Sequence, residues 1–168
     1  RIEWMEGYSY AHELEACMYA GGDKLENGFL KPWSEYKTSD WSEKSLFAIK
    51  QDVKLLSANI LKKGVDSLKR ALTKHDLKPS EIDYYLPHIS SHFFKDKLYQ
   101  EMVDNGVEIP WENWFMNLSK VGNVGSASIF LMLEELAHSG NLKKGQKILL
   151  SVPESSRFSY AYALLTVC

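Results

Sequence analysis

The chain has 168 residues, of which 45% are hydrophobic and 25% are charged, and its formal net charge is −2 at pH 7. This composition is that of a folded domain with a sizeable core, and the charge gives no indication of nucleic-acid binding. No apolar run reaches the ~18 residues of a membrane helix, so we expect no membrane partner. The two cysteines, Cys17 and Cys168, form neither a metal-ligand spacing nor a disulfide framework. We therefore expect no metal and a reducing, cytoplasmic location.

The first part of the chain predicts strands and one long helix. Residues 2–10 and 14–19 read as strands, because Trp and Tyr favour that conformation. Residues 22–40 are turn-rich and predict a loop or lid within a single domain, 1–168. Apolar residues three or four apart predict a long helix that begins at Asp40, with Gly64 on its apolar face where a neighbour can pack closely. The opposite face is basic and includes Lys54, which is either solvated or in contact with a phosphate-bearing ligand.

The second part predicts alternating strands and helices. A short buried strand at 82–86 is closed by Pro87 and His88, and Ser90 or Ser91 can cap the helix that follows. An apolar helix at 129–136 leads to strands at 148–152 and 158–167, which read as a terminal hairpin at a sheet edge. This alternation indicates an α/β fold: a layered mixed sheet with helices packed on it and a C-terminal β-hairpin.

Two polar residues occupy the positions where reactive groups lie in such folds. His88 follows a strand at its carboxyl end. Asn123 lies in the Gly-rich stretch Lys120-Val121-Gly122-Asn123-Val124-Gly125-Ser126-Ala127-Ser128, which predicts a tight turn before the apolar helix. Asn123 either caps that helix or is presented to a ligand.

These residues resemble a known family. The strand Asp83-Tyr84-Tyr85-Leu86-Pro87-His88, the Gly-Asn turn and the tail Lys144-Gly145-Gln146-Lys147-Ile148-Leu149-Leu150 occur in an order and spacing similar to those of the C-terminal half of β-ketoacyl-acyl-carrier-protein synthase III, a thiolase-fold condensing enzyme. The resemblance runs from about Trp41 to the end of the chain. It implies a thiolase-like half and a decarboxylative Claisen condensation of an acyl thioester with a malonyl thioester, in fatty-acid or polyketide-type biosynthesis.

The resemblance also implies site residues. His88 and Asn123 would bind the malonyl thioester carbonyl and stabilise the enolate, since an imidazole N–H and an amide NH₂ are two donors for one oxyanion. A backbone donor at Ser156 would add to this oxyanion hole, although Ser155-Ser156-Arg157-Phe158 replaces the family's Gly-Gly-Gly-Phe. Ser91 stands where the family has an Asn that assists the coenzyme A arm.

The implied partners follow from the same family. The nucleophilic cysteine lies in the N-terminal half, so the chain would act with that half and be inactive alone, and the full-length protein would be a homodimer. No cofactor is expected, because the substrates are acyl-coenzyme A and malonyl-acyl-carrier-protein types. Acyl carrier protein is a possible partner, but Lys95 and Lys97 are shifted relative to the family's docking helix.

Two other readings stay open at this point. A related acyltransferase could form an ester or an amide with His88 as general base. Alternatively, the chain could be a non-catalytic thiolase-fold subunit.

Overall fold

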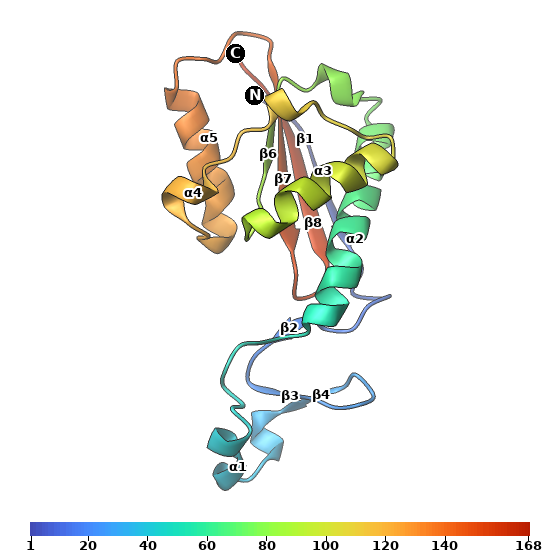
Figure 1. Ribbon diagram of the computed structural model, residues 1–168, viewed down its shortest axis with the longest axis vertical. Helices are drawn as coiled ribbons and strands as arrows, with labels where there is room; N and C mark the ends of the chain where they lie inside the picture. The colour runs from blue at the N-terminus through green and yellow to red at the C-terminus, as the bar shows by residue number, and fades with distance from the viewer. The chain divides into compact units, whose positions relative to one another are not determined.

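The computed structural model describes residues 1–168 and divides them into two compact units (Figure 1). Unit 1 comprises Arg1–Tyr8, Leu61–Pro153 and Tyr160–Cys168, and unit 2 comprises Ser9–Ile60 and Glu154–Ser159. The sequence analysis expected one domain with a loop at 22–40. Both His88 and Asn123 lie in unit 1, which therefore carries the site.

Unit 1 is built on a four-stranded mixed sheet with the strand order β1-β8-β7-β6. Its strands are β1 (Ile2–Ser9), β6 (Tyr84–Pro87), β7 (Lys147–Glu154) and β8 (Ser159–Thr166). Its helices are α3 (Lys95–Asp104), α4 (Leu118–Val121), α5 (Ser128–His138) and the part of α2 (Val53–Lys74) from Leu61 onward. Short 3₁₀ turns join them: η2 (Pro79–Glu81), η3 (His92–Phe94), η4 (Trp111–Asn113) and η5 (Gly125–Ala127). No helix of the chain is both long enough and apolar enough to cross a membrane.

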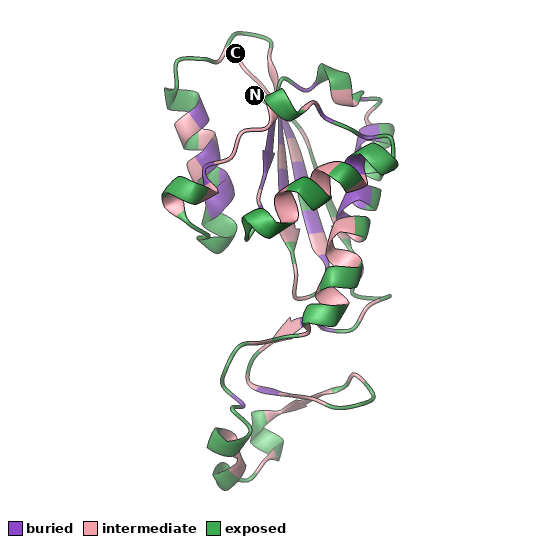
Figure 2. Cartoon of the chain, in the orientation of Figure 1, coloured by how far each residue is buried: buried purple, intermediate pink, exposed green.

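Helix α5 covers one face of the sheet. Leu86 of β6 and Ile148 of β7 form a buried cluster with three α5 residues, Ile129, Met132 and Leu136. Leu165 and Val167, at the end of the chain, also pack against this cluster. Figure 2 shows the burial concentrated on the strands and on the inward side of the helix.

Helix α2 covers the opposite face. Along β8, Tyr160 and Tyr162 alternate with Leu165, so they point away from α5. The Tyr162 hydroxyl donates to the Gly64 carbonyl oxygen of α2 at 2.7 Å, and it lies 2.9 Å from the buried Ser67 hydroxyl. The sheet thus lies between helix layers, and the predicted α/β fold is confirmed.

The terminal hairpin does not lie at a sheet edge as predicted. Strand β1 pairs with β8, and the Thr166 amide donates to the Arg1 carbonyl oxygen at 2.8 Å. The hairpin strands β7 and β8 are therefore central, and β1 and β6 form the edges. No local sequence pattern indicates this arrangement, because pairing between the two ends of a chain depends on tertiary folding.

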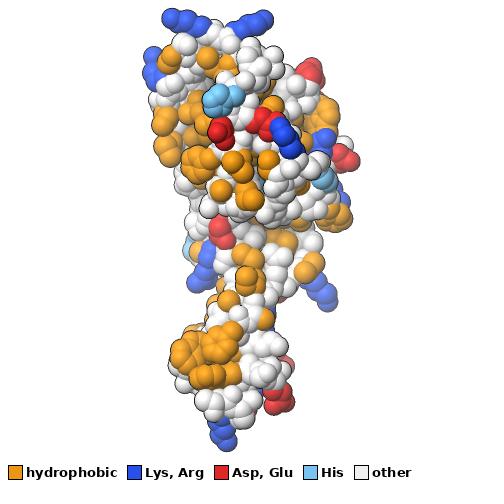
Figure 3. Space-filling model, turned by 90° about the vertical axis from the view of Figure 1, so that its left-hand side faces the viewer, with side chains coloured by type: hydrophobic (Ala, Val, Ile, Leu, Met, Phe, Trp, Pro, Cys, Tyr) orange, Lys and Arg blue, Asp and Glu red, His pale blue; other side chains and the backbone are white.

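Unit 2 contains two small sheets and a short helix. Strand β2 (Met18–Tyr19) pairs with β5 (Lys50–Gln51), and β3 (Gly22–Lys24) pairs with β4 (Leu30–Pro32). The predicted loop at 22–40 therefore includes the β3–β4 hairpin and the 3₁₀ turn η1 (Trp33–Glu35), and it runs into α1 (Thr38–Glu43). Figure 3 shows exposed hydrophobic side chains gathered on this part of unit 2. They include Trp33 and Phe47, which pack against Trp41 with ring centroids 5.2 and 5.5 Å apart.

The predicted start of the long helix is wrong. The polar-x-x-acid pattern at Asp40 falls within the separate helix α1, and α2 begins at Val53. The Asp52 carboxylate accepts a hydrogen bond from the Leu55 amide at 2.9 Å and so caps α2. The helix-start pattern at Asp40 was therefore assigned to the wrong helix.

The glycine on the inner face of α2 provides a test of this packing. A Cβ atom at Gly64 would lie 3.0 Å from Cε1 of the buried Tyr160 ring, so the sequence prediction of close packing is confirmed. Alanine normally stabilises a helix interior relative to glycine by about 1 kcal/mol. We expect Gly64→Ala to lower the free energy of unfolding instead, by about 1–3 kcal/mol, because the added methyl overpacks the interface. Urea denaturation measures the change.

The matched control is Ser57→Ala on the exposed side of the same helix. This change should leave the free energy of unfolding within about 0.5 kcal/mol of wild type or raise it slightly. A stabilising Gly64→Ala would show that the Tyr160 ring does not constrain this position.

Candidate active site

The backbone of His88 is fixed by the parallel pairing of β6 with β7. The register places Pro87 opposite Ser151, and the His88 amide donates to the Ser151 carbonyl oxygen at 2.8 Å. Proline has no amide hydrogen, so the ladder passes over Pro87 and resumes at His88. The imidazole consequently lies just past the carboxyl end of β6, as the sequence predicted.

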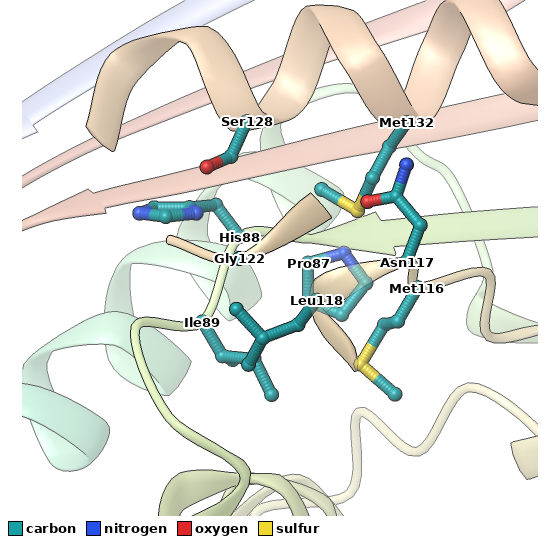
Figure 4. Close-up of a pocket in the computed structure, with 9 residues that line it drawn as sticks. All are labelled: Pro87, His88, Ile89, Met116, Asn117, Leu118, Gly122, Ser128 and Met132. Atoms are coloured by element: carbon teal, nitrogen blue, oxygen red, sulfur yellow. The ribbon is translucent and has the colours of Figure 1, made fainter. Parts of the chain in front are cut away.

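The side chain of His88 lines a small pocket beside the start of α5 (Figure 4). In Figure 4 the Ser128 hydroxyl points toward the imidazole, and the Asn117 carboxamide lies beside the Met132 thioether. The pocket has room for about one water molecule, with a volume of about 10 Å³. Its lining residues are Pro87, His88, Ile89, Met116, Asn117, Leu118, Gly122, Ser128 and Met132.

Burial determines the protonation state of His88. Desolvation disfavours the imidazolium, so the pKa of His88 lies below its usual value of 6.5. Neither ring nitrogen has a hydrogen-bond partner in the chain. At neutral pH the ring is therefore uncharged, with one N–H free to donate and one nitrogen free to accept.

The Gly-rich turn follows α4 and has the backbone conformation that its glycines predicted. Gly122 has φ 75° and ψ −177°, and Gly125 has φ 61°, both outside the range that other residues adopt readily. Between them Asn123 is exposed, and its Oδ1 accepts a hydrogen bond from the Gly125 amide at 3.0 Å. The Nδ2 amide of Asn123 has no partner in the chain.

The capping alternative for Asn123 is wrong. Helix α5 begins at Ser128 with Ala127 as its N-cap residue, and no side chain caps it there. The 3₁₀ turn η5 intervenes, so Asn123 is too far from the first helical turn to satisfy its amides. Asn123 does not line the pocket itself, but Gly122 and Ser128 on either side of it do.

One carboxylate fixes α4 against α5. Glu135 accepts hydrogen bonds from the Asn117 side-chain amide at 2.9 Å and from the Lys120 ammonium at 2.8 Å. Hydrogen bonds from Lys120 and Asn117 hold the pKa of Glu135 below its usual value. The sequence does not predict this group, because Asn117 and Lys120 lie 18 and 15 residues before Glu135 and nothing in the local pattern links them.

The other predicted site residues are not among those that line this pocket. The Ser91 hydroxyl accepts from the Phe93 amide at 3.2 Å and so caps η3, as predicted. Lys54 is exposed in the first turn of α2, within unit 2. Ser156 is also in unit 2, and its backbone amide donates to the Glu154 carboxylate.

The buried cysteine has the environment of an inert thiol. Cys17 is fully buried in unit 2, and its Sγ lies 3.3 Å from the Asp52 carbonyl oxygen. Burial, followed by the charge of Asp52, raises the pKa of Cys17 above its usual value. This environment favours the uncharged thiol over the reactive thiolate.

Comparison with known proteins finds a family match over the stretch that contains both candidate residues. Residues 72–153, which include both His88 and Asn123, match the family described as 3-oxoacyl-[acyl-carrier-protein (ACP)] synthase III C terminal. The chain is synthase III-like. This finding confirms the resemblance that the sequence motifs indicated.

Curated relatives of the synthase III-like chain are longer proteins. It is 33% identical over 86 residues to a beta-ketoacyl-[acyl-carrier-protein] synthase III of Clostridium novyi, covering 51% of this chain and 25% of that protein. It is 23% identical over 149 residues to the protein of the same name from Streptococcus pyogenes, covering 88% of this chain and 44% of that protein. The chain thus spans less than half the length of these relatives.

Solved structures confirm the fold of the synthase III-like chain. The crystal structure of 3-oxoacyl-(acyl carrier protein) synthase III from Pseudomonas aeruginosa PAO1 superposes with a TM-score of 0.66 at 18% identity. The match covers 98% of this chain and 45% of that one. The predicted thiolase-like half is therefore confirmed.

The lowered pKa of His88 gives a test of the pocket. Between the folded-state pKa and 6.5, the unfolded chain binds more protons than the folded chain, so stability rises with pH across this window. The stability contributed by neutral His88 is complete above pH 6.5 and declines as the pH falls below that value. We expect the His88 ring to titrate with a midpoint below 6.5, as measured by NMR of its ring protons.

The variant His88→Gln should remove this part of the pH dependence of urea unfolding, because the amide does not titrate. A His88 midpoint at or above 6.5 would contradict the assignment of a desolvated imidazole.

Proposed function

We propose that the chain is the C-terminal part of a condensing enzyme that joins an acyl thioester to a malonyl thioester with loss of CO₂. One observation carries the proposal: His88 shares a pocket with Gly122 and Ser128, between which Asn123 lies in the sequence, inside the stretch that matches the synthase III family. The relatives of that name are about twice as long as this chain or longer, so the nucleophilic cysteine is assigned to an N-terminal half.

Asn123 and His88 suit the role of paired donors. The Oδ1 of Asn123 is engaged by the Gly125 amide, which directs the NH₂ group away from the turn. The neutral imidazole of His88 offers one N–H without placing a full charge in the pocket. Both groups would donate to the thioester carbonyl oxygen of the malonyl substrate.

The chemistry follows from where charge develops. When the bond between the malonyl α-carbon and its carboxylate breaks, CO₂ leaves and the electron pair moves onto the thioester oxygen as an enolate. Donors already in place stabilise this oxyanion more than the neutral carbonyl, which lowers the barrier. The enolate carbon then attacks the acyl-cysteine carbonyl, a C–C bond forms, and the cysteine leaves as a thiolate.

The remaining predicted contacts belong to the same proposal. Ser91 and Lys54 would bind the thioester arm and its phosphate, and acyl carrier protein or coenzyme A would deliver the substrates. The full-length protein would be a homodimer and would need no cofactor. A backbone donor at Ser156 would contribute once the Glu154 carboxylate releases that amide.

The neutral imidazole also favours a second candidate. With a free ring nitrogen, His88 could remove the proton from an alcohol or amine that attacks the acyl thioester. This acyl transfer to oxygen or nitrogen would need no malonyl substrate, so decarboxylation separates the two candidates.

The decisive assay is malonyl-thioester decarboxylation by the full-length protein that contains this chain. We expect His88→Ala and Asn123→Asp each to lower kcat by about 10²–10³-fold, because each removes one donor to the developing oxyanion.

The matched controls change the same residue types at exposed positions away from the pocket. His138→Ala lies at the end of α5, and Asn141→Asp lies in the loop beyond it. Both should decarboxylate at the wild-type rate. If His88→Ala and Asn123→Asp do the same, the condensing assignment of these residues is wrong. A wild-type protein that does not decarboxylate malonyl thioesters but loses acyl transfer on His88→Ala would support the general-base candidate.

A further inference from the structure

A hydrogen bond links the segments that follow His88 and precede Asn123. The His92 Nε2 atom lies 2.8 Å from the Ser119 Oγ atom, although the two residues are 27 positions apart. His92 opens η3, four residues after His88, and Ser119 is in α4, four residues before Asn123.

This bond is the only side-chain hydrogen bond between residues 88–104 and residues 115–127. The α4 turn is otherwise held from the α5 side, where Glu135 binds Asn117 and Lys120. The Asn123 side chain bonds only within its own turn, to the Gly125 amide. The Val124 amide of the turn also donates to the Ser128 hydroxyl of α5 at 3.3 Å. On the side that faces the His88 segment, the placement of the turn therefore depends on how α4 is held.

The turn that contains Asn123 follows α4 directly, so a shift of α4 also shifts this turn. Its backbone is a single helical turn, in which the Gly122 amide donates to the Leu118 carbonyl oxygen at 2.9 Å. A displacement at Ser119 is thus transmitted to Gly122 and to the residue that follows it. His92 is fixed in turn, because it lies in the 3₁₀ turn η3, which the Ser91 hydroxyl caps.

We propose that His92 and Ser119 are positioning residues that set the separation between the His88 imidazole and the Asn123 carboxamide. The inference rests on the proposed function, in which both groups must reach one thioester oxygen. Two donors that converge on a single atom tolerate little displacement, and a misplacement of about 1 Å can cost a factor of about 10² in rate. Neither His92 nor Ser119 contacts the substrate in this role.

The first test is steady-state decarboxylation of a malonyl thioester by the full-length protein. We expect His92→Ala and Ser119→Ala each to lower kcat by about three- to tenfold, the factor that one net hydrogen bond represents, with KM unchanged. The double variant should be no slower than the slower single variant, because both changes remove the same bond. His92→Gln should recover most of the rate, since its amide reaches the position of Nε2.

The control is Tyr99→Phe, which removes another exposed hydrogen bond of this region. The Tyr99 hydroxyl donates to Glu108 at 2.5 Å, and this bond does not reach the Asn123 segment. Tyr99→Phe should retain the wild-type kcat. Wild-type rates in both alanine variants, or a double variant in which the two effects multiply, would overturn the inference.

The second test does not depend on activity. Amide hydrogen exchange at residues 122–125 should be about three- to tenfold faster in both alanine variants, with His92→Gln close to wild type and β6 and β7 unchanged. If the wild-type protein does not decarboxylate malonyl thioesters, the proposed function fails and exchange alone decides the positioning role. Unchanged exchange at residues 122–125 would overturn that role.

Discussion

The parallel pairing of β6 with β7 is the interaction on which the candidate site depends. It aligns Leu86 with Leu150 and Pro87 with Ser151, and it ends where the His88 amide reaches the Ser151 carbonyl oxygen. Because side chains alternate along a strand, Leu86 points to the face that α5 covers. The same pairing thus fixes the α5 core and places the imidazole beside the beginning of that helix. A shift of one residue in this register would turn these side chains to the opposite face.

The second requirement is a backbone that can turn sharply between α4 and α5. Gly122 supplies a conformation that other residues rarely adopt, and the turn that follows displays Asn123 at the surface of the chain. Glu135 holds α4 on one side and His92 on the other, and the Val124 amide of the turn donates to the Ser128 hydroxyl of α5. The Asn123 NH₂ group has no partner in the chain, which is what the proposed role of Asn123 as a donor to a thioester oxygen requires.

Much of the fold could be predicted because the local signals were strong. The strand before His88 is buried and ends at a proline, and the glycines around Asn123 require unusual backbone angles, so both features were visible in the sequence. The start of α2 was not predicted, because the polar-x-x-acid pattern at Asp40 belongs to the separate helix α1, whereas Asp52 caps α2. The positions of Ser156 and Lys54 in unit 2 also had no local signal. The β3–β4 hairpin of this unit is local, but the pairing of β2 with β5 joins Met18 to Gln51, 33 positions apart, and no short segment encodes it.

The amino-acid order alone determined the α/β class, the identity of His88 and Asn123 as candidates, and the likeness to synthase III that the family match bears out. Those features can be predicted from short stretches, because the pattern of neighbouring residues is sufficient to indicate them. Only the tertiary structure decided that the hairpin is central, that Ser128 and Asn117 join His88 in one pocket, and that His92 bonds Ser119. The reason is physical: contacts between residues tens of positions apart depend on how the sheet and helices pack, and packing is a property of the whole fold.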